Sequence, residues 1–198
     1  GQDEEANAIL GGCATLLVIL SVLFTVVLQV VKEPMLYLFG ATDNTIGYAM
    51  DYLGIYLSGT IFVELSLGLN FFITAQGFST VGMATVLIGA VVNIVLDPVF
   101  IFGLNMGVSG AALATITAQA VSAVWVVCFL KGRRTKLRLQ RRFARLDWKV
   151  LSPVLALGVA PFIMQSTESL VNIAFNSSLK AYGGDPAVGA MTICSSIM

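Results

Sequence analysis

Residues 8–31 read AILGGCATLLVILSVLFTVVLQVV, a run of 24 residues without a charged side chain. At about 1.5 Å of rise per residue, such a helix is long enough to cross the roughly 30 Å hydrocarbon core of a bilayer. A soluble helix of this length would need a continuous polar face, and this stretch has none. It therefore predicts a membrane-spanning α-helix and an integral membrane protein.

The rest of the 198-residue chain has the same character. Hydrophobic residues make up 57% and charged residues 11%, with a mean hydropathy of +0.89, whereas soluble domains carry about 25% charge. Further spans are predicted over residues 52–75, 83–102, 108–130 and 150–179, and Pro186 opens a sixth helix too short to cross a bilayer. The predicted fold is an all-α integral membrane protein, a polytopic transmembrane helix bundle. We expect the chain to be a piece of a longer protein.

The positive charges gather in one segment. Nine of the 11 Lys and Arg residues lie within residues 131–149, and the positive-inside bias places this connector in the cytoplasm. Leu139, Phe143 and Leu146 have the spacing of a short basic helix on anionic headgroups. Basic residues alternating with apolar ones also occur in nucleic-acid-binding patches. A connector that sets the topology is the simpler interpretation, so the lipid bilayer is expected as a partner and nucleic acid is not.

The residues that enzymes commonly use are missing. The chain has no histidine, which excludes histidine-based nucleophilic catalysis and histidine-ligated zinc. Its three cysteines lie in apolar runs and are interpreted as packing residues. No HExxH, GxSxG or Asp-rich diphosphate motif occurs. The chain is not expected to be an enzyme or to need a cofactor.

Three carboxylates, Glu64, Asp97 and Glu168, fall inside predicted spans, where each costs roughly 2.5–3.5 kcal/mol. Asn93 and Asp97 are four residues apart and share one helix face, and Pro98 removes the N–H that would bind the Ile94 carbonyl. Carboxylate, amide and carbonyl oxygens suit a small cation, and a carboxylate in a low dielectric also takes up a proton. Asn93 and Asp97 are therefore candidate ligands for Na⁺ or, through Asp97, a site for H⁺. The alternatives are a helix-packing role and a position near the outer headgroups.

Two other helices carry patterns of polar or small residues. A stripe on the fifth predicted span is too polar for lipid and predicts a substrate cavity in preference to helix packing: Gln165, Glu168, Ser169, Asn172 and Asn176. The fourth predicted span has a seam of small residues that permits close helix approach: Gly110, Ala114, Ala118 and Ser122. Glu64 has no such stripe, so both a packing role and a cavity role stay open for it.

The motifs on these helices resemble those of the multidrug and toxic compound extrusion (MATE) transporters. The resemblance rests on NIVLDP at 93–98, GVSGAALAT at 107–115 with Gln119, GVAPFIMQ at 158–165, and YGGDPAVGA at 182–190. It covers essentially the whole chain and looks like the MepA-type bacterial branch of the family. The family fold has twelve helices in two lobes. This chain would span the third to seventh helices and the start of the eighth.

The resemblance also implies a function and a site. Residues 1–130 would be four helices of the amino lobe, 131–149 the cytoplasmic connector, and 150–198 the start of the carboxy lobe. Asn93, Asp97 and Thr115 match positions that form the family's amino-lobe cation or proton site, whose further aspartate lies outside this sequence. The expected protein is a monomeric, multi-pass antiporter of the bacterial inner membrane. It would export organic cations or amphipathic drugs in exchange for H⁺ or Na⁺.

Two other non-enzymatic functions fit the sequence less well than drug export. A flippase or exporter of lipid-linked oligosaccharides with a related fold should line its cavity with basic residues to hold phosphates, and the predicted spans contain no Lys or Arg. A purely structural membrane scaffold explains the spans but gives no role to Asn93 and Asp97 beside Pro98. Drug antiport therefore accounts for more of the sequence.

Overall fold

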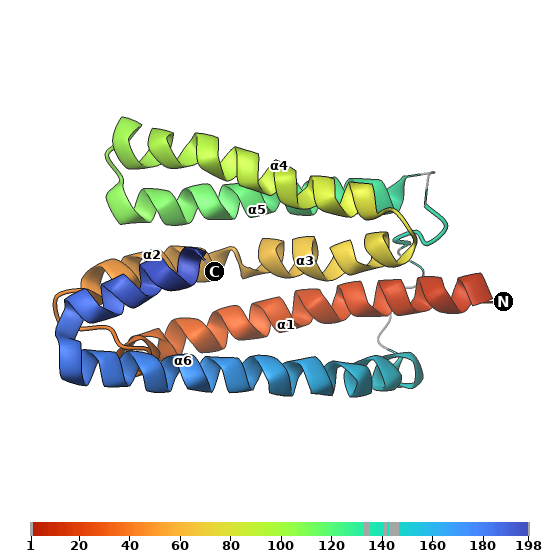
Figure 1. Ribbon diagram of the computed structural model, residues 1–198. Coiled ribbons are helices and arrows are strands. Elements are labelled where there is room, and N and C mark those ends of the chain that lie inside the picture. Colours follow the sequence, from red (N-terminus) through yellow and green to blue (C-terminus); the bar gives the residue numbers. More distant parts are fainter. Residues whose placement is uncertain (1, 133–134, 141, 143–146, 198) are drawn as a thin grey trace.

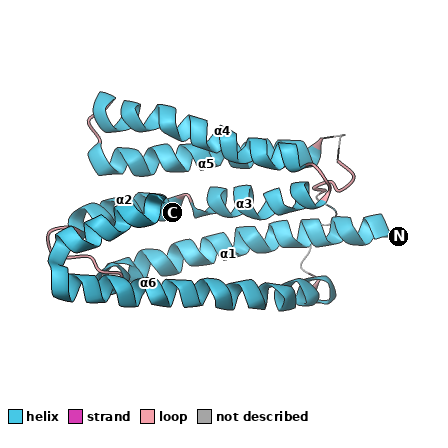
Figure 2. Cartoon of the chain, in the orientation of Figure 1, coloured by secondary structure: helices cyan, strands magenta, loops and turns pink. Residues whose placement is uncertain are grey.

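The computed structural model describes residues 2–132, 135–140, 142 and 147–197, and this part of the chain is helical (Figure 1). The elements are listed here in chain order: α1 Gln2–Leu38, α2 Ile46–Ser58, α3 Thr60–Ala75, α4 Ser79–Pro98, the π-helical turn η1 Val99–Gly103, α5 Gly107–Lys131 and α6 Trp148–Ile197. The described residues contain no strand (Figure 2). The prediction of an all-α membrane protein is confirmed.

The first five helices form a bundle organised around α5. This helix packs against α2, α3 and α4, while α1 packs against α2 and α3. Leu10, Leu69, Ile73, Val126 and Leu130 are fully buried where α1, α3 and α5 meet. Figure 1 shows α6 running beside α1, which is the helix of the bundle that it contacts.

Most large apolar side chains face outward. Val30 and Leu157 are each 79% exposed and Phe71 is 76% exposed, a pattern that suits contact with lipid and not with water. Among the described residues, four segments are long and apolar enough to cross a membrane: Glu4–Leu38, Ser79–Gly103, Gly107–Lys131 and Trp148–Gly184. If the bent α2–α3 pair is counted as one span, there are up to five spans. These segments correspond to the five complete spans predicted from the sequence.

The second span differs from its prediction as one continuous helix over residues 52–75. It begins earlier and bends by 57° between α2 and α3, at Gly59. A Cβ atom at Gly59 would lie 2.6 Å from Ile116 Cγ1, so α5 can approach this point only because the residue is glycine. Side chains of α1 bind carbonyls beside the bend. Thr25 Oγ1 donates to the Leu57 carbonyl (3.0 Å) and Gln29 Nε2 donates to the Gly54 carbonyl (2.7 Å).

The ends of two other helices also differ from their predicted positions. The first helix was predicted to end before Glu33-Pro34, but α1 continues through Pro34 to Leu38. Pro34 disturbs the helix at the carbonyl four residues earlier, but the helical hydrogen bonds resume after it, and the Phe39 N–H donates to the Met35 carbonyl (3.0 Å). The last helix is assigned as one element, but Gly184 has φ 64° and ψ −165°, which separates it into the two predicted segments.

The described part of the basic connector does not form a surface helix, which was the less favoured interpretation of this segment. Leu139 packs against the buried cluster of Leu10, Leu69 and Leu130, and its N–H donates to the Leu130 carbonyl (3.1 Å). Leu139 therefore faces protein and not the headgroup layer. The other two residues of that prediction, Phe143 and Leu146, lie outside the described residues.

Candidate functional site

Asn93 and Asp97 on α4 lie together with Thr115 on α5. The Asn93 Nδ2 is 3.4 Å from Asp97 Oδ1 and 3.5 Å from Thr115 Oγ1. All three residues are half-buried. Turning the Asn93 amide over would add its own oxygen to those of Asp97 and Thr115. The cluster can therefore offer three oxygen ligands and one negative charge to a small cation, or one carboxylate to a proton.

Small residues bring the two helices of this cluster together. Gly110 of α5 is buried against the main chain of η1, and a Cβ there would lie 2.8 Å from the Phe100 carbonyl carbon and oxygen. Further along, the Ser122 hydroxyl donates to the Thr85 carbonyl of α4 (3.1 Å). Ala114 and Ala118 between them are also buried. The predicted seam of small residues is thus the surface through which α5 packs against α4 and η1, and this packing holds Thr115 near Asn93.

The backbone is irregular directly after Asp97. Pro98 has no N–H, and the Val99 N–H donates to the Leu96 carbonyl instead of the Val95 carbonyl that a regular α-helix would use. The π-helical turn η1 follows at once. Such turns are frequent at functional sites because they free main-chain groups from the regular helical pattern.

A cavity of about 260 Å³ lies beside this cluster between α3, α4 and α5, and we call it the polar cavity because several polar side chains line it among apolar ones. Asn93 and Thr115 line it, together with Ser66 and Asn70 of α3 and Gln119 of α5. The Ser66 hydroxyl donates to Gln119 Oε1 (2.8 Å), and Asn70 Nδ2 donates to the Gly82 carbonyl (3.2 Å). The Asn70 Oδ1 is buried and has no hydrogen-bond partner in the described part of the chain.

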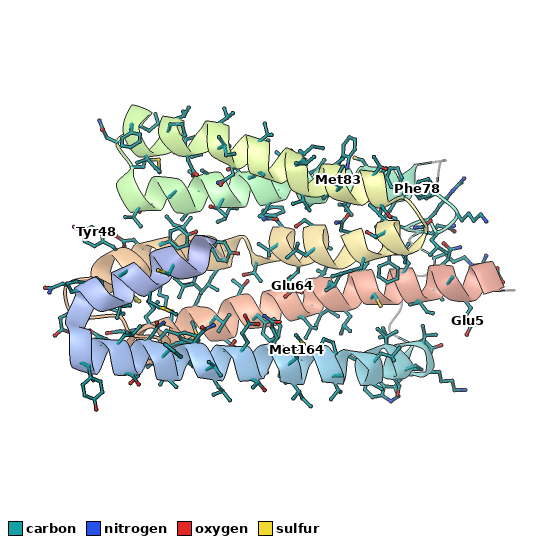
Figure 3. The ribbon with its side chains drawn as sticks, viewed as in Figure 1. Glu5, Tyr48, Glu64, Phe78, Met83 and Met164 are labelled. Atoms are coloured by element: carbon teal, nitrogen blue, oxygen red, sulfur yellow. The ribbon has the colours of Figure 1, made fainter. Side chains whose placement is uncertain are left out.

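Ser66 and Asn70 are not among the site residues predicted from the sequence. They are four residues apart on one predicted span, the same spacing that drew attention to Asn93 and Asp97, and this was the available signal. Glu64 belongs to the same helix but is not among the residues that line the cavity. Figure 3 shows it on α3, toward α1.

The polar stripe on α6 is separate from this cluster. Gln165, Glu168 and Asn172 are exposed, and Gln165 Nε2 donates to Glu168 Oε2 (3.1 Å). Asn176 instead donates from Nδ2 to the Phe39 carbonyl (3.3 Å), in the loop after α1. Lys180, one turn later, donates to the Ala41 carbonyl (2.6 Å). Among the described helices, α6 makes no contact with α4 or α5.

The cluster offers oxygen ligands to a cation, and the described region contains no larger set of metal-ligating side chains. No group of three or more His, Cys, Asp or Glu side chains occurs there. The cluster itself contains no thiol or imidazole, and a site with one carboxylate suits a monovalent cation or a proton better than zinc or copper.

Comparisons with known proteins agree with this fold. The MatE family model matches residues 1–99, which is half of the chain. The chain is 29% identical over 143 residues to the multidrug export protein MepA of Staphylococcus haemolyticus, an alignment that covers 72% of this chain and 32% of that protein. It is 27% identical over 191 residues to the probable multidrug resistance protein YoeA of Bacillus subtilis, covering 93% and 41%.

A solved structure shows the same fold. The MATE multidrug transporter DinF-BH superposes with a TM-score of 0.87 and 34% identity, over 99% of this chain and 49% of that one. The chain belongs to the MatE family, whose members are multi-pass membrane transporters and not enzymes. It spans less than half the length of these curated relatives.

Proposed function

We propose that this chain is part of a multidrug efflux antiporter that exports organic cations or amphipathic drugs in exchange for H⁺ or Na⁺. The observation that carries the proposal is the cluster of Asn93, Asp97 and Thr115, which places one carboxylate and two polar side chains between membrane helices beside a polar cavity. A charge inside a membrane span costs free energy, so we expect it to serve transport or helix packing. A relative named as a multidrug export protein and one named as a probable multidrug resistance protein support a role in transport.

The proposal includes the organisation of the chain. Residues 1–130 form part of the amino lobe, 131–149 the cytoplasmic connector and 150–198 the start of the carboxy lobe of a twelve-helix transporter. The protein would be a monomer in the bacterial inner membrane. The concentration of Lys and Arg in the connector supports this orientation.

In this mechanism the Asp97 carboxylate binds the coupling ion. When the carboxylate is charged, it attracts Na⁺ or H⁺ from outside, with Asn93 and Thr115 as neutral ligands or hydrogen-bond partners. Binding of the ion neutralises the site and changes the relative stability of the two lobe arrangements. Release of the ion to the inside restores the charge, so that ion entry is linked to drug export.

The experiment that tests this function is transport by the full-length protein in proteoliposomes. A fluorescent organic cation serves as substrate, and the pH gradient and the sodium gradient are imposed one at a time. We expect the substrate to move against its own gradient when at least one ion gradient is present. No movement under either gradient, from protein that is correctly folded, would contradict drug antiport.

Glu168 is proposed to select cationic substrates. It is exposed on α6 beside Gln165 and Asn172, on the face predicted to line the substrate cavity. Two unit charges 4 Å apart interact by about 1 kcal/mol in water and about 4 kcal/mol at an effective dielectric of 20. Glu168→Gln keeps the size of the side chain, so we expect a cationic drug to lose at least about fivefold in affinity.

The control for Glu168 is a neutral drug of similar shape, whose binding should change little. Both affinities are measured on purified full-length wild-type and Glu168→Gln protein over a pH series. Equal losses for the two drugs would show that Glu168 acts through structure, and unchanged binding of both would remove it from the substrate path.

A further inference from the structure

The described connector residues 135–140 form a strap across one end of the bundle. The Leu137 N–H donates to Gln76 Oε1 (3.0 Å), beyond the end of α3. The Arg138 N–H donates to Asn7 Oδ1 of α1 (2.7 Å). The Leu139 N–H donates to the Leu130 carbonyl of α5. Groups on or beside three helices therefore fix the backbone of the strap.

The side chains of the strap alternate in character. Leu137 and Leu139 are half-buried against the apolar core, whereas Lys136, Arg138 and Gln140 are exposed. Alternate side chains of the strap therefore face the bundle and the outside. The strap thus closes the core with its leucines and holds positive charge at the end of the bundle that is proposed to be cytoplasmic.

A groove of about 400 Å³ begins at the strap and continues between α1, α3 and α5. Its walls are mostly apolar and include Ala14, Val18, Leu65, Leu69 and Val127. The hydroxyl of Thr15, another lining residue, is bonded to the Gly11 carbonyl (3.0 Å). Lys131 is the charged residue among those that line the groove.

The groove is distinct from the polar cavity. Leu65 and Leu69 line the groove, and the residues that follow each of them, Ser66 and Asn70, line the cavity. One residue turns an α-helix by about 100°, so the two spaces lie on different sides of α3. Ala14 and Val18 belong to the α1 segment that is apolar enough to span the membrane, which places the groove at the depth of lipid chains.

We propose that this groove binds an anionic phospholipid of the inner leaflet, with an acyl chain along α1, α3 and α5 and the phosphate beside Lys131. The inference rests on the proposed orientation of the connector. Apolar walls accept a hydrocarbon chain, and a lysine at the mouth is complementary to a headgroup with negative charge. A zwitterionic lipid would occupy the same groove but would be attracted less strongly to Lys131.

The lipid would also stabilise the fold. Its acyl chain would touch Leu139 and its phosphate would lie near the end of α5, so that it joins the strap to the bundle. A ligand that binds only the folded protein raises its apparent stability. Binding and thermal stability therefore provide two measurements that require neither an ion gradient nor a drug.

The test uses the full-length protein in detergent, titrated with phosphatidylglycerol or with phosphatidylcholine of the same chain length. Bound lipid is counted by native mass spectrometry, and the unfolding midpoint is recorded alongside. We expect preferential binding of phosphatidylglycerol. In Lys131→Gln that affinity should fall about fivefold, with little change for phosphatidylcholine. Val18→Trp should reduce the binding of both lipids because the indole occupies the groove.

Lys149→Gln is the matched control, since it removes one positive charge from the same connector at a residue that does not line the groove. Three results would overturn the proposal. They are equal binding of the two lipids by the wild type, equal effects of Lys131→Gln and Lys149→Gln, and displacement of phosphatidylglycerol by glycerol phosphate without chains at equal concentration. Each result leaves the proposed drug transport untouched, because no transport is measured.

Discussion

Replacing Asp97 by Asn is expected to reduce gradient-driven drug export by at least about tenfold while the protein still reaches the membrane. The two side chains have nearly the same volume, and the amide oxygen of Asn can still accept the hydrogen bond that Asn93 donates at 3.4 Å. The negative charge is lost, and with it an attraction to a cation worth about 4 kcal/mol at 4 Å and an effective dielectric of 20. Asn also cannot take up and release a proton. The measurement is the initial rate of export by the full-length protein in proteoliposomes.

Asn93→Ala provides the graded comparison for Asp97→Asn. It removes a neutral partner of Asp97 and Thr115 but leaves the carboxylate, so export should fall less than in Asp97→Asn. Protein amount in the vesicles is measured for both variants, which separates transport from expression. Undiminished export by Asp97→Asn under both ion gradients would assign Asp97 to helix packing.

The membrane spans and the Asn93–Asp97 pair of the candidate site could be predicted from the sequence because both depend on local spacing. A long uncharged run predicts a membrane helix wherever it packs, and residues four apart on a helix meet whatever surrounds them. Asn93 and Asp97 meet in this way. The position of Thr115 beside them depends on how closely α5 approaches α4, and the sequence supplied it only through the family resemblance.

Features that depend on contacts between distant residues could not be predicted. At the Gly59 bend, Ile116 of α5 approaches closely, and Thr25 and Gln29 of α1 bind nearby carbonyls. A hydropathy pattern over residues 52–75 contains none of this information. Asn176 contacts Phe39, a residue 137 positions away, and the spacing of polar residues on one helix contains no information about such a contact. The polar stripe on that helix therefore suggested only a cavity-lining role for Asn176.

Gly110→Ala is expected to destabilise the protein by about 1–3 kcal/mol, the usual cost of excess volume in a packed interior. The new methyl group would lie 2.8 Å from the Phe100 carbonyl atoms, and a main chain cannot turn away as a side chain can. Elsewhere in a helix the same change favours folding by roughly 0.5–1 kcal/mol, so the sign of the effect is informative. The unfolding midpoint of the purified full-length protein measures it.

Two other glycines on the α4–η1 side of this interface give matched controls for Gly110→Ala. At Gly103 a Cβ would have no atom within 4 Å, so Gly103→Ala should leave the unfolding midpoint almost unchanged. At Gly89 the nearest atom is the Ser122 hydroxyl oxygen at 2.7 Å, which can rotate, so Gly89→Ala should have an intermediate effect. Because Gly110 sets the distance between α4 and α5 near Asp97 and Thr115, export should fall in the same order as stability. Equal midpoints for Gly103→Ala and Gly110→Ala would mean that α4 and α5 do not approach each other as closely as this geometry requires.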